Sequence, residues 1–331
     1  MKALIYHEFG EVGVLKYEDT PVPEINDDEV LIKVKASSIN SLDNRLRSGK
    51  SPRPVDLPHI GGIDISGDVD DIGKDVSGFS KGDRVVIDPT VRLDKGFEVI
   101  GVNRHGGFAE YAKVPGINVV KIPDNLEYDD ASTLPICFAT AWYGLYDRGG
   151  IQDGERVLVH AAGSGTGSAA IQVAKNAGAY VIATAGSDEK LENAKKLGAD
   201  ETINYNNSDF AEEVKRITEN KGVNIIFDQI GASVWEKNIQ SLSGKGRLLL
   251  VGVVGGGAVN AMIGPIIMRD LSVLGVTVFN SPRKNLESVV RLASEGTFKS
   301  IVYKKFPLEH GSDAQKILED RNQFGKVVLN P

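Results

Sequence analysis

The 331-residue sequence contains a single cysteine, Cys137, and this scarcity excludes two classes of architecture. A disulfide framework needs several cysteines, and so does a structural zinc or iron–sulfur site built on a cysteine cage. No run approaches 18 apolar residues, which excludes a transmembrane helix. The formal net charge of −7 leaves no surplus of basic residues. We therefore expect neither nucleic acid nor a membrane surface as a partner.

The sequence begins with a short strand-like run and lacks the basic region, long apolar segment and cleavage site of a secretory signal. A cytoplasmic location is the expectation that follows. At about 150 residues per domain, the length suggests two domains. Glycine is plentiful, with 37 residues, or about 11% against a norm of roughly 7%. These glycines are expected in turns or in a ligand-binding loop.

The predicted secondary structure changes near Asp129. Before it, short β-prone runs separated by turn residues occur at 2–6, 30–36, 84–87 and 111–114. After it, strands alternate with helices, which predicts a parallel sheet covered on both faces. The expected strands of this sheet are 156–161, 180–185, 223–228, 247–253 and 272–278, and the expected helices are 169–177, one capped by Ser187 that ends before Gly198, 209–218 and 233–242. The tail is mixed, with helices expected at 286–293 and 314–318 and a strand at 326–329.

A glycine-rich loop, residues 160–168 (HAAGSGTGS), follows a strand and opens a helix. Glycine lets the backbone approach a pyrophosphate, and the helix N-terminus offers unpaired N–H groups and the positive end of its dipole. The matching register, Ala162-x-Ser164-x-x-Gly167, is a variant of the G-x-G-x-x-G pattern. In this context the loop favours dinucleotide binding over a tight turn without a ligand.

The end of the next strand bears on which dinucleotide is bound. An NAD site usually has an acidic residue there for the ribose 2′-hydroxyl, but this strand ends in residues 184–187 (TAGS). Ser187, Lys190 and Tyr205 offer two hydroxyls and an ammonium for a 2′-phosphate, so NADPH is the predicted cofactor. The alternative is a helix cap, a solvated lysine and a half-buried tyrosine, and the acids Asp188 and Glu189 lie close by.

Several short motifs resemble, in order and spacing, the medium-chain dehydrogenase/reductase superfamily, and within it the zinc-free quinone oxidoreductase-like branch. They are residues 106–111 (GGFAEY), 131–135 (ASTLP), 140–141, the glycine loop, 183–187 (ATAGS) and 325–329 (GKVVL). The resemblance covers essentially the whole chain and implies an α/β fold. A GroES-like β-rich catalytic domain would comprise residues 1–125 and 283–331. A Rossmann domain with a doubly wound parallel sheet would comprise residues 126–282, with the active site between the two domains.

The resemblance also implies that a catalytic zinc is absent. Where zinc-binding members carry a cysteine after the third strand, this chain has Asn40, and their Gly-His-Glu is Gly62-Ile63-Asp64 here. The third ligand position is Ile136, and Cys137 is one residue out of register. The four-cysteine structural lobe is missing as well. His59 or His105 could still bind a metal together with Asp64, but a lone histidine is more often structural.

Without zinc, oxidation of an alcohol lacks a group that stabilises the alkoxide. Hydride addition to a quinone or an activated C=C is easier, because a carbonyl already delocalises the developing charge. We expect the catalytic residues Asn40, Asp43 and Asp64, with Asn40 as hydrogen-bond donor; Arg45 and Arg47 are interpreted as a solvated helix face. The residues expected to bind the cofactor are Thr140, Ser164, Gly165, Thr166, Gly167, Ser187, Lys190, Tyr205, Gly252, Val253 and Phe279.

The leading hypothesis is a zinc-independent, NADPH-dependent reductase of enones, enoyl thioesters or quinones. One alternative is an alcohol dehydrogenase-type enzyme that acts on an alcohol or aldehyde, with an unusual metal or none. Another is a non-catalytic NADPH-binding sensor or structural protein on the same fold. The resemblance further suggests a homodimer, paired through the strand expected at residues 272–278.

Overall fold

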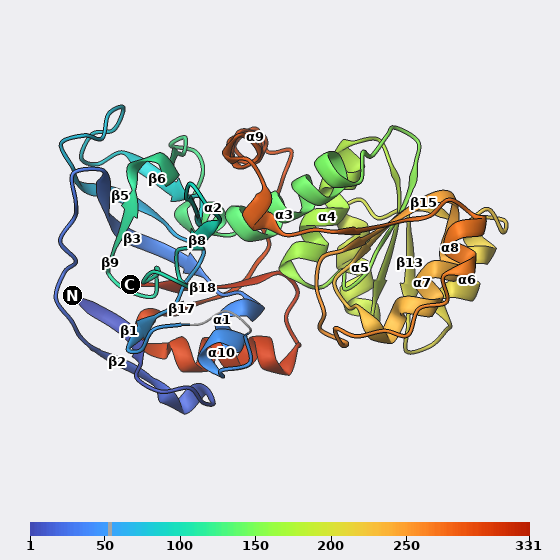
Figure 1. Cartoon of the computed structure of the whole chain (residues 1–331), viewed down its shortest axis with the longest axis horizontal. Coiled ribbons are helices and arrows are strands. Elements are labelled where there is room, and N and C mark those ends of the chain that lie inside the picture. Colours follow the sequence, from blue (N-terminus) through green and yellow to red (C-terminus); the bar gives the residue numbers. More distant parts are fainter. Residues whose placement is uncertain (52–54) are drawn as a thin grey trace. The chain divides into compact units, whose positions relative to one another are not determined.

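The computed structural model describes residues 1–51 and 55–331 of the chain. These residues form two compact units, which Figure 1 shows together. Unit 1 consists of Met1–Ile136 and Pro282–Pro331, and unit 2 consists of Cys137–Ser281. Residues 126–136, which we expected in the Rossmann domain, belong to unit 1. Among the described residues, no helix is both long and apolar enough to cross a membrane.

A seven-stranded sheet forms the centre of unit 1. Its strands are ordered β10-β6-β5-β3-β18-β17, and β9 also pairs with β3. Neighbouring strands run antiparallel, except that β17 and β18 are parallel. The strands are β3 (Glu29–Ser38), β5 (Ser66–Ile72), β6 (Arg84–Ile87), β9 (Tyr111–Pro115), β10 (Val119–Lys121), β17 (Val302–Pro307) and β18 (Lys326–Asn330).

Two smaller sheets and four α-helices complete the described part of unit 1. One small sheet has the strand order β2-β1-β4 and the other pairs β7 with β8. These strands are β1 (Lys2–Tyr6), β2 (Leu15–Asp19), β4 (His59–Ile60), β7 (Thr90–Arg92) and β8 (Phe97–Val99). The helices are α1 (Ser41–Arg47), α2 (Tyr128–Ser132), α9 (Arg283–Ser294) and α10 (Gly311–Asp320).

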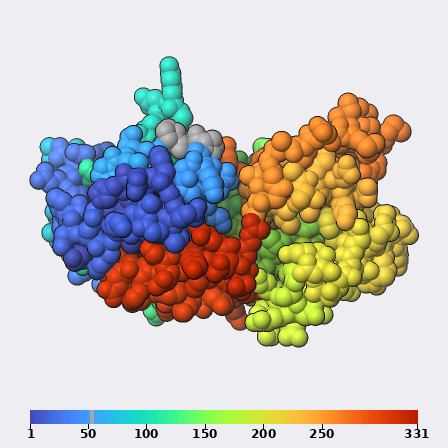
Figure 2. All heavy atoms as spheres, turned by 90° about the horizontal axis from the view of Figure 1, so that it is seen from below, coloured from blue at the N-terminus to red at the C-terminus, as the bar shows by residue number. Residues whose placement is uncertain are grey.

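Segments from both halves of the sequence build unit 1. Alternating apolar residues of β3, among them Val30, Ile32 and Val34, are buried in one core because strand side chains project to opposite faces in turn. The late strand β18 pairs with the end of β3, with Val328 opposite Ser38. Figure 2 accordingly shows residues near the C-terminus, in red, beside N-terminal residues in blue. Elements far apart in sequence therefore meet at the end of β3.

Unit 2 has a six-stranded parallel sheet in the order β13-β12-β11-β14-β15-β16. This order, with the first strand in the middle, is that of a doubly wound dinucleotide-binding fold. The strands are β11 (Arg156–Val159), β12 (Tyr180–Ala185), β13 (Glu201–Asn204), β14 (Val223–Asp228), β15 (Leu242–Leu250) and β16 (Ser272–Gly275). The helices are α3 (Ala139–Trp142), α4 (Gly165–Asn176), α5 (Asp188–Lys196), α6 (Phe210–Ile217), α7 (Trp235–Ser241) and α8 (Gly264–Met268).

The core of unit 2 explains why its strands are nearly continuous apolar runs. Leu158, Ile182 and Ile226 from three neighbouring strands are fully buried, together with Val214 of α6. Both faces of a parallel sheet are covered, so alternation disappears. Three expected strands of this sheet differ in extent, and the first of them, β11, already ends at Val159. β15 begins at Leu242 and ends at Leu250, and β16 already ends at Gly275.

Candidate active site

The glycine loop is a tight connection between β11 and α4. Ala161 has a positive φ of 52°, and a Cβ atom on Gly167 would lie 2.2 Å from the Ala161 carbonyl oxygen. The loop therefore closes only because residue 167 has no side chain. Ser164 is the N-cap of α4, and its Oγ accepts a hydrogen bond from the Gly167 N–H at 2.9 Å. This strand–loop–helix geometry fits a pyrophosphate at the helix N-terminus.

The three residues expected at the 2′-phosphate lie at the glycine loop and just beyond the end of β12. Ser187 Oγ caps α5 by accepting the Lys190 N–H at 3.4 Å. A Cβ on Gly163 would lie 2.8 Å from Lys190 Cδ, and a Cβ on Gly186 would lie 2.7 Å from the Tyr205 hydroxyl oxygen. Partial burial lowers the pKa of Lys190. The side chains of Lys190 and Tyr205 thus lie against the backbone of the loop and of the strand end.

The other expected cofactor residues lie in separate parts of unit 2. Thr140 is buried in α3, while Gly252 and Val253 follow the end of β15. Phe279 lies in a 3₁₀ turn, Val278–Asn280, and not at a strand end as expected. A Cβ on Gly252 would lie 2.7 Å from the carbonyl oxygen of Gln229, which places the turn after β15 against β14.

A buried polar network next to the glycine loop was not predicted from the sequence. His160 Nδ1 lies 2.9 Å from Thr184 Oγ1, and its Nε2 lies 2.8 Å from Asn238 Oδ1. Burial lowers the pKa of His160, which favours the neutral ring. Gln229 links this network to the loop, because its Nε2 donates to the His160 carbonyl and its Oε1 accepts from Ser164 Oγ. No short motif signals such a network, since its members come from four strands and helices.

Unit 1 holds a cluster of four buried polar side chains where β3 ends and β18 begins. The lysine cluster, as we name it, consists of Ser38, Asn40, Asp64 and Lys326. Lys326 Nζ donates to Asn40 Oδ1 at 2.6 Å and to Asp64 Oδ2 at 3.2 Å. Asn40 Nδ2 donates to Asp64 Oδ2 at 2.9 Å and reaches the Ser38 carbonyl oxygen only at 3.5 Å. The structure therefore brings together Asn40 and Asp64, both predicted as catalytic.

Both carboxylate oxygens of Asp64 are engaged. Besides the two donors above, Oδ2 accepts from Ser38 Oγ at 2.7 Å, and Oδ1 accepts from the Ile136 N–H at 3.1 Å. Asp64 has no exposed surface, whereas Asn40 remains 8% exposed and Lys326 6% exposed. A buried charge needs a partner and hydrogen bonds, and Lys326 supplies the partner. Asp64 is consequently poorly placed to take a proton from a substrate.

Asp43, the third residue predicted as catalytic, contacts the backbone. Its carboxylate accepts from the Asn40 N–H at 2.7 Å and from the Gly62 N–H at 3.2 Å. Burial raises the pKa of Asp43 to about 7, although these hydrogen bonds and the nearby Lys326 charge act in the opposite direction. Asp43 thus holds the backbone on either side of the lysine cluster.

Comparison with known proteins identifies the family. Residues 26–124 match the alcohol dehydrogenase GroES-like domain, and residues 165–295 match the zinc-binding dehydrogenase family. Human quinone oxidoreductase is 31% identical over 99% of this chain and 97% of its own length. The chain belongs to the medium-chain dehydrogenase/reductase superfamily. It falls in the quinone oxidoreductase-like branch, so the predicted family and α/β fold are confirmed.

Relatives within this superfamily carry different descriptions. A zinc-type alcohol dehydrogenase-like protein of Schizosaccharomyces pombe is 32% identical, with 99% of each chain covered. A solved NAD-dependent alcohol dehydrogenase is 39% identical with a TM-score of 0.95, covering all of both chains. A Pseudomonas syringae quinone oxidoreductase is 29% identical with a TM-score of 0.88, covering 100% of this chain and 99% of its own. The superfamily makes this chain an oxidoreductase that uses a nicotinamide cofactor.

Several members of the superfamily bind zinc, so the histidines that could act as ligands bear on this chain. His59 Nε2 lies 3.1 Å from the Gly101 carbonyl oxygen, and His105 Nδ1 accepts the Ile60 N–H at 3.3 Å. Burial lowers the pKa of His59 to about 4. Within residues 1–51 and 55–331, no group of three or more histidine, cysteine or acidic residues is arranged to hold a metal.

The interpretation of Arg45 and Arg47 as a solvated helix face is wrong for Arg47. Arg45 is exposed, but Arg47 is only 1% exposed. Its guanidinium donates to the Gly10 carbonyl at 2.6 Å, to Gln315 Oε1 at 2.8 Å and to Glu319 Oε1 at 2.6 Å. The sequence could not reveal this burial because the partners belong to α10, about 270 residues later, and to the loop after β1.

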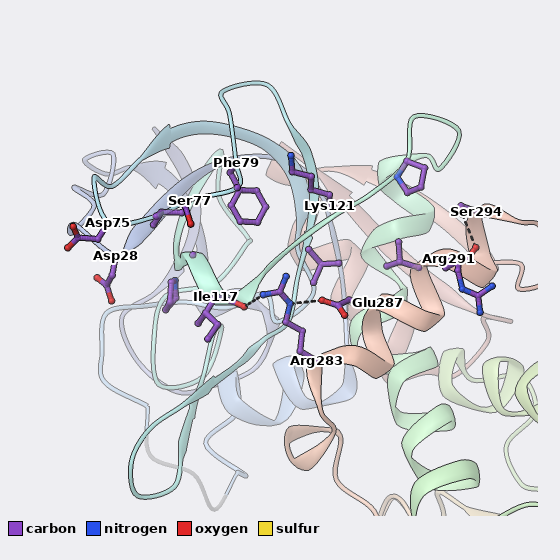
Figure 3. A pocket seen from close by; sticks show the side chains of 17 residues that line it. Asp28, Asp75, Ser77, Phe79, Ile117, Lys121, Arg283, Glu287, Arg291 and Ser294 are labelled. Atoms are coloured by element: carbon purple, nitrogen blue, oxygen red, sulfur yellow. Dashed lines mark hydrogen bonds and ion pairs between the residues drawn. The ribbon is translucent and has the colours of Figure 1, made fainter.

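A hollow of about 910 Å³ lies in unit 1, beside α9 and apart from the lysine cluster (Figure 3). Its lining includes Asp28, Asp75, Phe79, Ile117, Lys121, Arg283, Glu287 and Arg291. The basic side chains there face acids: Lys121 pairs with Asp83 at 2.8 Å, Arg283 with Glu287 at 3.0 Å and Arg291 with Glu295 at 2.8 Å. This hollow contains none of the residues predicted for the active site.

Proposed function

We propose that this chain is an NADPH-dependent reductase that works without zinc and delivers hydride to a quinone, an enone or an enoyl thioester. The lysine cluster carries the proposal, because it offers hydrogen-bond donors and no accessible base. Alcohol oxidation requires a group that removes the hydroxyl proton. Asp64, the only carboxylate of the cluster, already accepts four hydrogen bonds. A hydrogen-bond donor instead suits reduction, in which the carbonyl oxygen of the hydride acceptor gains negative charge.

Residues of unit 2 fit the nicotinamide nucleotide. Backbone N–H groups at the start of α4 would hold the pyrophosphate, and Ser187, Lys190 and Tyr205 would hold the 2′-phosphate. When bound, the cofactor would supply a hydride, that is, two electrons and one proton, and would itself be oxidised. Asn40 would donate from Nδ2 to the carbonyl oxygen of the acceptor as charge develops there. A proton from water then completes reduction of a quinone to a hydroquinone, or of an enone to a saturated ketone.

A second candidate function is NAD-dependent alcohol oxidation. The observation in its favour is the 39% identity to a solved NAD-dependent alcohol dehydrogenase. The two candidates demand different groups: alcohol oxidation needs a base or a metal, and reduction of a conjugated carbonyl needs a donor.

One assay series on the purified protein separates these functions. Oxidation of NADPH and NADH is measured with quinones, enones and enoyl thioesters, and reduction of NADP⁺ and NAD⁺ with alcohols, while zinc is quantified in the same sample. We expect turnover of NADPH with at least one acceptor class and zinc far below one equivalent. Stoichiometric zinc together with alcohol oxidation would instead establish the second candidate. Cofactor binding without any turnover would indicate a sensor.

The proposed enzyme is a homodimer. The parallel sheet of unit 2 ends at β16, which pairs only with β15 among the described strands. Large apolar side chains are exposed in the segment that leads to this edge, part of which is orange in Figure 2. They are Val253, Val254, Val259, Met262, Ile263, Ile267, Met268 and Val273. A second copy pairing its own β16 across a two-fold axis would satisfy the open edge and cover part of this surface.

A further inference from the structure

The orientation of the Asn40 amide is fixed by two neighbours of opposite character. An ammonium has three donors and no acceptor, so the group that faces Lys326 Nζ at 2.6 Å must be the amide oxygen. An ionised carboxylate only accepts, so the group that faces Asp64 Oδ2 at 2.9 Å must be the amide nitrogen. A flipped amide would turn N–H groups toward the ammonium and an oxygen toward the carboxylate. Both contacts would then be repulsive.

This orientation leaves Asn40 with one poorly used donor. One N–H of Nδ2 is directed to Asp64, and the contact of Nδ2 with the Ser38 carbonyl oxygen, at 3.5 Å, is at the outer limit of a hydrogen bond. Asn40 is also the most exposed member of the lysine cluster, at 8%. Within this cluster, Asn40 is therefore the side chain best placed to donate to another molecule.

We propose that Lys326 is a positioning residue, which fixes the Asn40 amide in its donor orientation and strengthens that donor with the positive charge of its ammonium group. The proposal rests on the proposed function, in which Asn40 donates to the acceptor oxygen. An ammonium bound to the amide oxygen draws electron density from the amide nitrogen, because hydrogen bonds in a chain polarise one another. The remaining N–H then stabilises negative charge on a substrate oxygen more strongly than an isolated asparagine would.

A simpler role for Lys326 would be to neutralise the buried carboxylate of Asp64. The two roles of Lys326 can be distinguished in variants whose residue 64 carries no charge. Asp64→Asn keeps an amide oxygen that can accept from Asn40 and Ser38, and leaves the ammonium in place. The double variant Asp64→Asn/Lys326→Met differs from it only at Lys326. Methionine is similar in length to lysine and carries no charge. Because residue 64 is asparagine in both variants, neither contains an unpaired buried carboxylate.

The first measurement follows the amide itself and needs no turnover. In protein labelled with ¹⁵N-asparagine, the Asn40 side-chain resonances are identified by their loss in Asn40→Ser. Asp64→Asn is the reference, because it lacks the carboxylate that Asn40 Nδ2 faces in the wild type. Relative to Asp64→Asn, we expect shifted, faster-exchanging Asn40 amide protons in the double variant. Unchanged Asn40 resonances in the double variant would overturn the proposal. This comparison retains its meaning even if the wild type reduces none of the acceptors, in which case the proposed function alone has failed.

The second measurement is steady-state turnover with the acceptor identified above. We expect kcat of the double variant to be at least about thirtyfold below that of Asp64→Asn, with the KM for the acceptor changed less than about threefold. Lys305→Met is the matched control, because Lys305 pairs with Asp129 on the surface of the same unit; its kcat should equal that of the wild type. Equal kcat values for the double variant and Asp64→Asn would show that Lys326 only balances charge, which overturns the proposal.

Discussion

The side chain of Lys190 lies directly against Gly163 of the glycine loop, since a Cβ atom on Gly163 would approach Lys190 Cδ to 2.8 Å. This relationship predicts the cofactor preference. Lys190→Ala should weaken NADPH binding about tenfold or more, because a charge-assisted hydrogen bond to the 2′-phosphate is lost, and should change NADH binding little. Fluorescence titration of both cofactors measures the two dissociation constants.

The control for this prediction is Lys195→Ala, which removes an exposed lysine near the other end of α5 and should leave both constants unchanged. Gly163→Ala should displace Lys190 and lower the preference for NADPH in the same direction. Equal losses for NADPH and NADH in Lys190→Ala would refute the 2′-phosphate site.

Arg47 should contribute strongly to the stability of unit 1. Arg47→Met leaves Gln315 Oε1 and the Gly10 carbonyl without their buried donor. The Glu319 side chain is 37% exposed and can be rehydrated, so the expected cost is about 1–3 kcal/mol. Urea denaturation measures the free energy of unfolding. Arg45→Met, on the exposed face of the same helix, should cost less than about 0.5 kcal/mol. Similar losses for the two variants would contradict the buried position of Arg47.

His59 and Asp43 should impose opposite pH dependences on stability. The pKa of His59 is lowered to about 4, so the folded state resists a proton that the unfolded state accepts. The free energy of unfolding therefore falls by up to about 3 kcal/mol as the pH decreases from about 6.5 to 4. The pKa of Asp43 is raised to about 7, so its contribution is present at low pH and is lost as the pH rises from about 4 to 7.

The two contributions offset each other in the wild type and separate in variants. His59→Phe should leave a stability that falls with rising pH, and Asp43→Asn should leave one that falls with decreasing pH. Chemical denaturation followed by circular dichroism, at intervals between pH 4 and 7.5, measures both slopes relative to the wild type. Parallel profiles for the two variants would show that one or both pKa shifts are absent.

The proposed dimer predicts a change in molecular mass. Val273→Lys places a charge in the edge strand β16, which would pair with β16 of a second copy, so sedimentation velocity should show a monomer in place of a dimer. Ile117→Lys alters another exposed apolar residue, 76% exposed in unit 1, and should leave the dimer intact. A dimer that persists in Val273→Lys would place the interface elsewhere.

Local sequence patterns predicted the parallel sheet well. The apolar runs at 180–185 and 223–228 are strands at the same residues, and Ser187 caps its helix as its residue type indicated. Periodicity reports burial within a few neighbouring residues, so it was least accurate where tertiary contacts decide an element's end. β16 ends at Gly275, three residues before the predicted end.

The candidate site was predictable only where its chemistry is local. The glycine loop and Lys190 lie within one continuous strand–helix–strand–helix segment, β11 to α5, so their spacing carries information. Lys326 was expected only as part of a strand and a family motif. Its partner Asp64 lies 262 residues earlier, and no periodicity connects such distant positions. The same distance hid the contacts of Arg47 with α10.

The pairing of β18 with β3 has a consequence for how the protein is made. Asn40 and Asp64 leave the ribosome well before Lys326, which is separated from Asp64 by 262 residues. At about 5–20 residues per second, this delay lasts roughly 13–50 seconds. Throughout that interval the nascent carboxylate lacks its ammonium, while all of unit 2 is translated. Unit 2 can therefore be folded before the lysine cluster of unit 1 is assembled, so a partly synthesised chain would bind the nucleotide before the proposed donor Asn40 is in place.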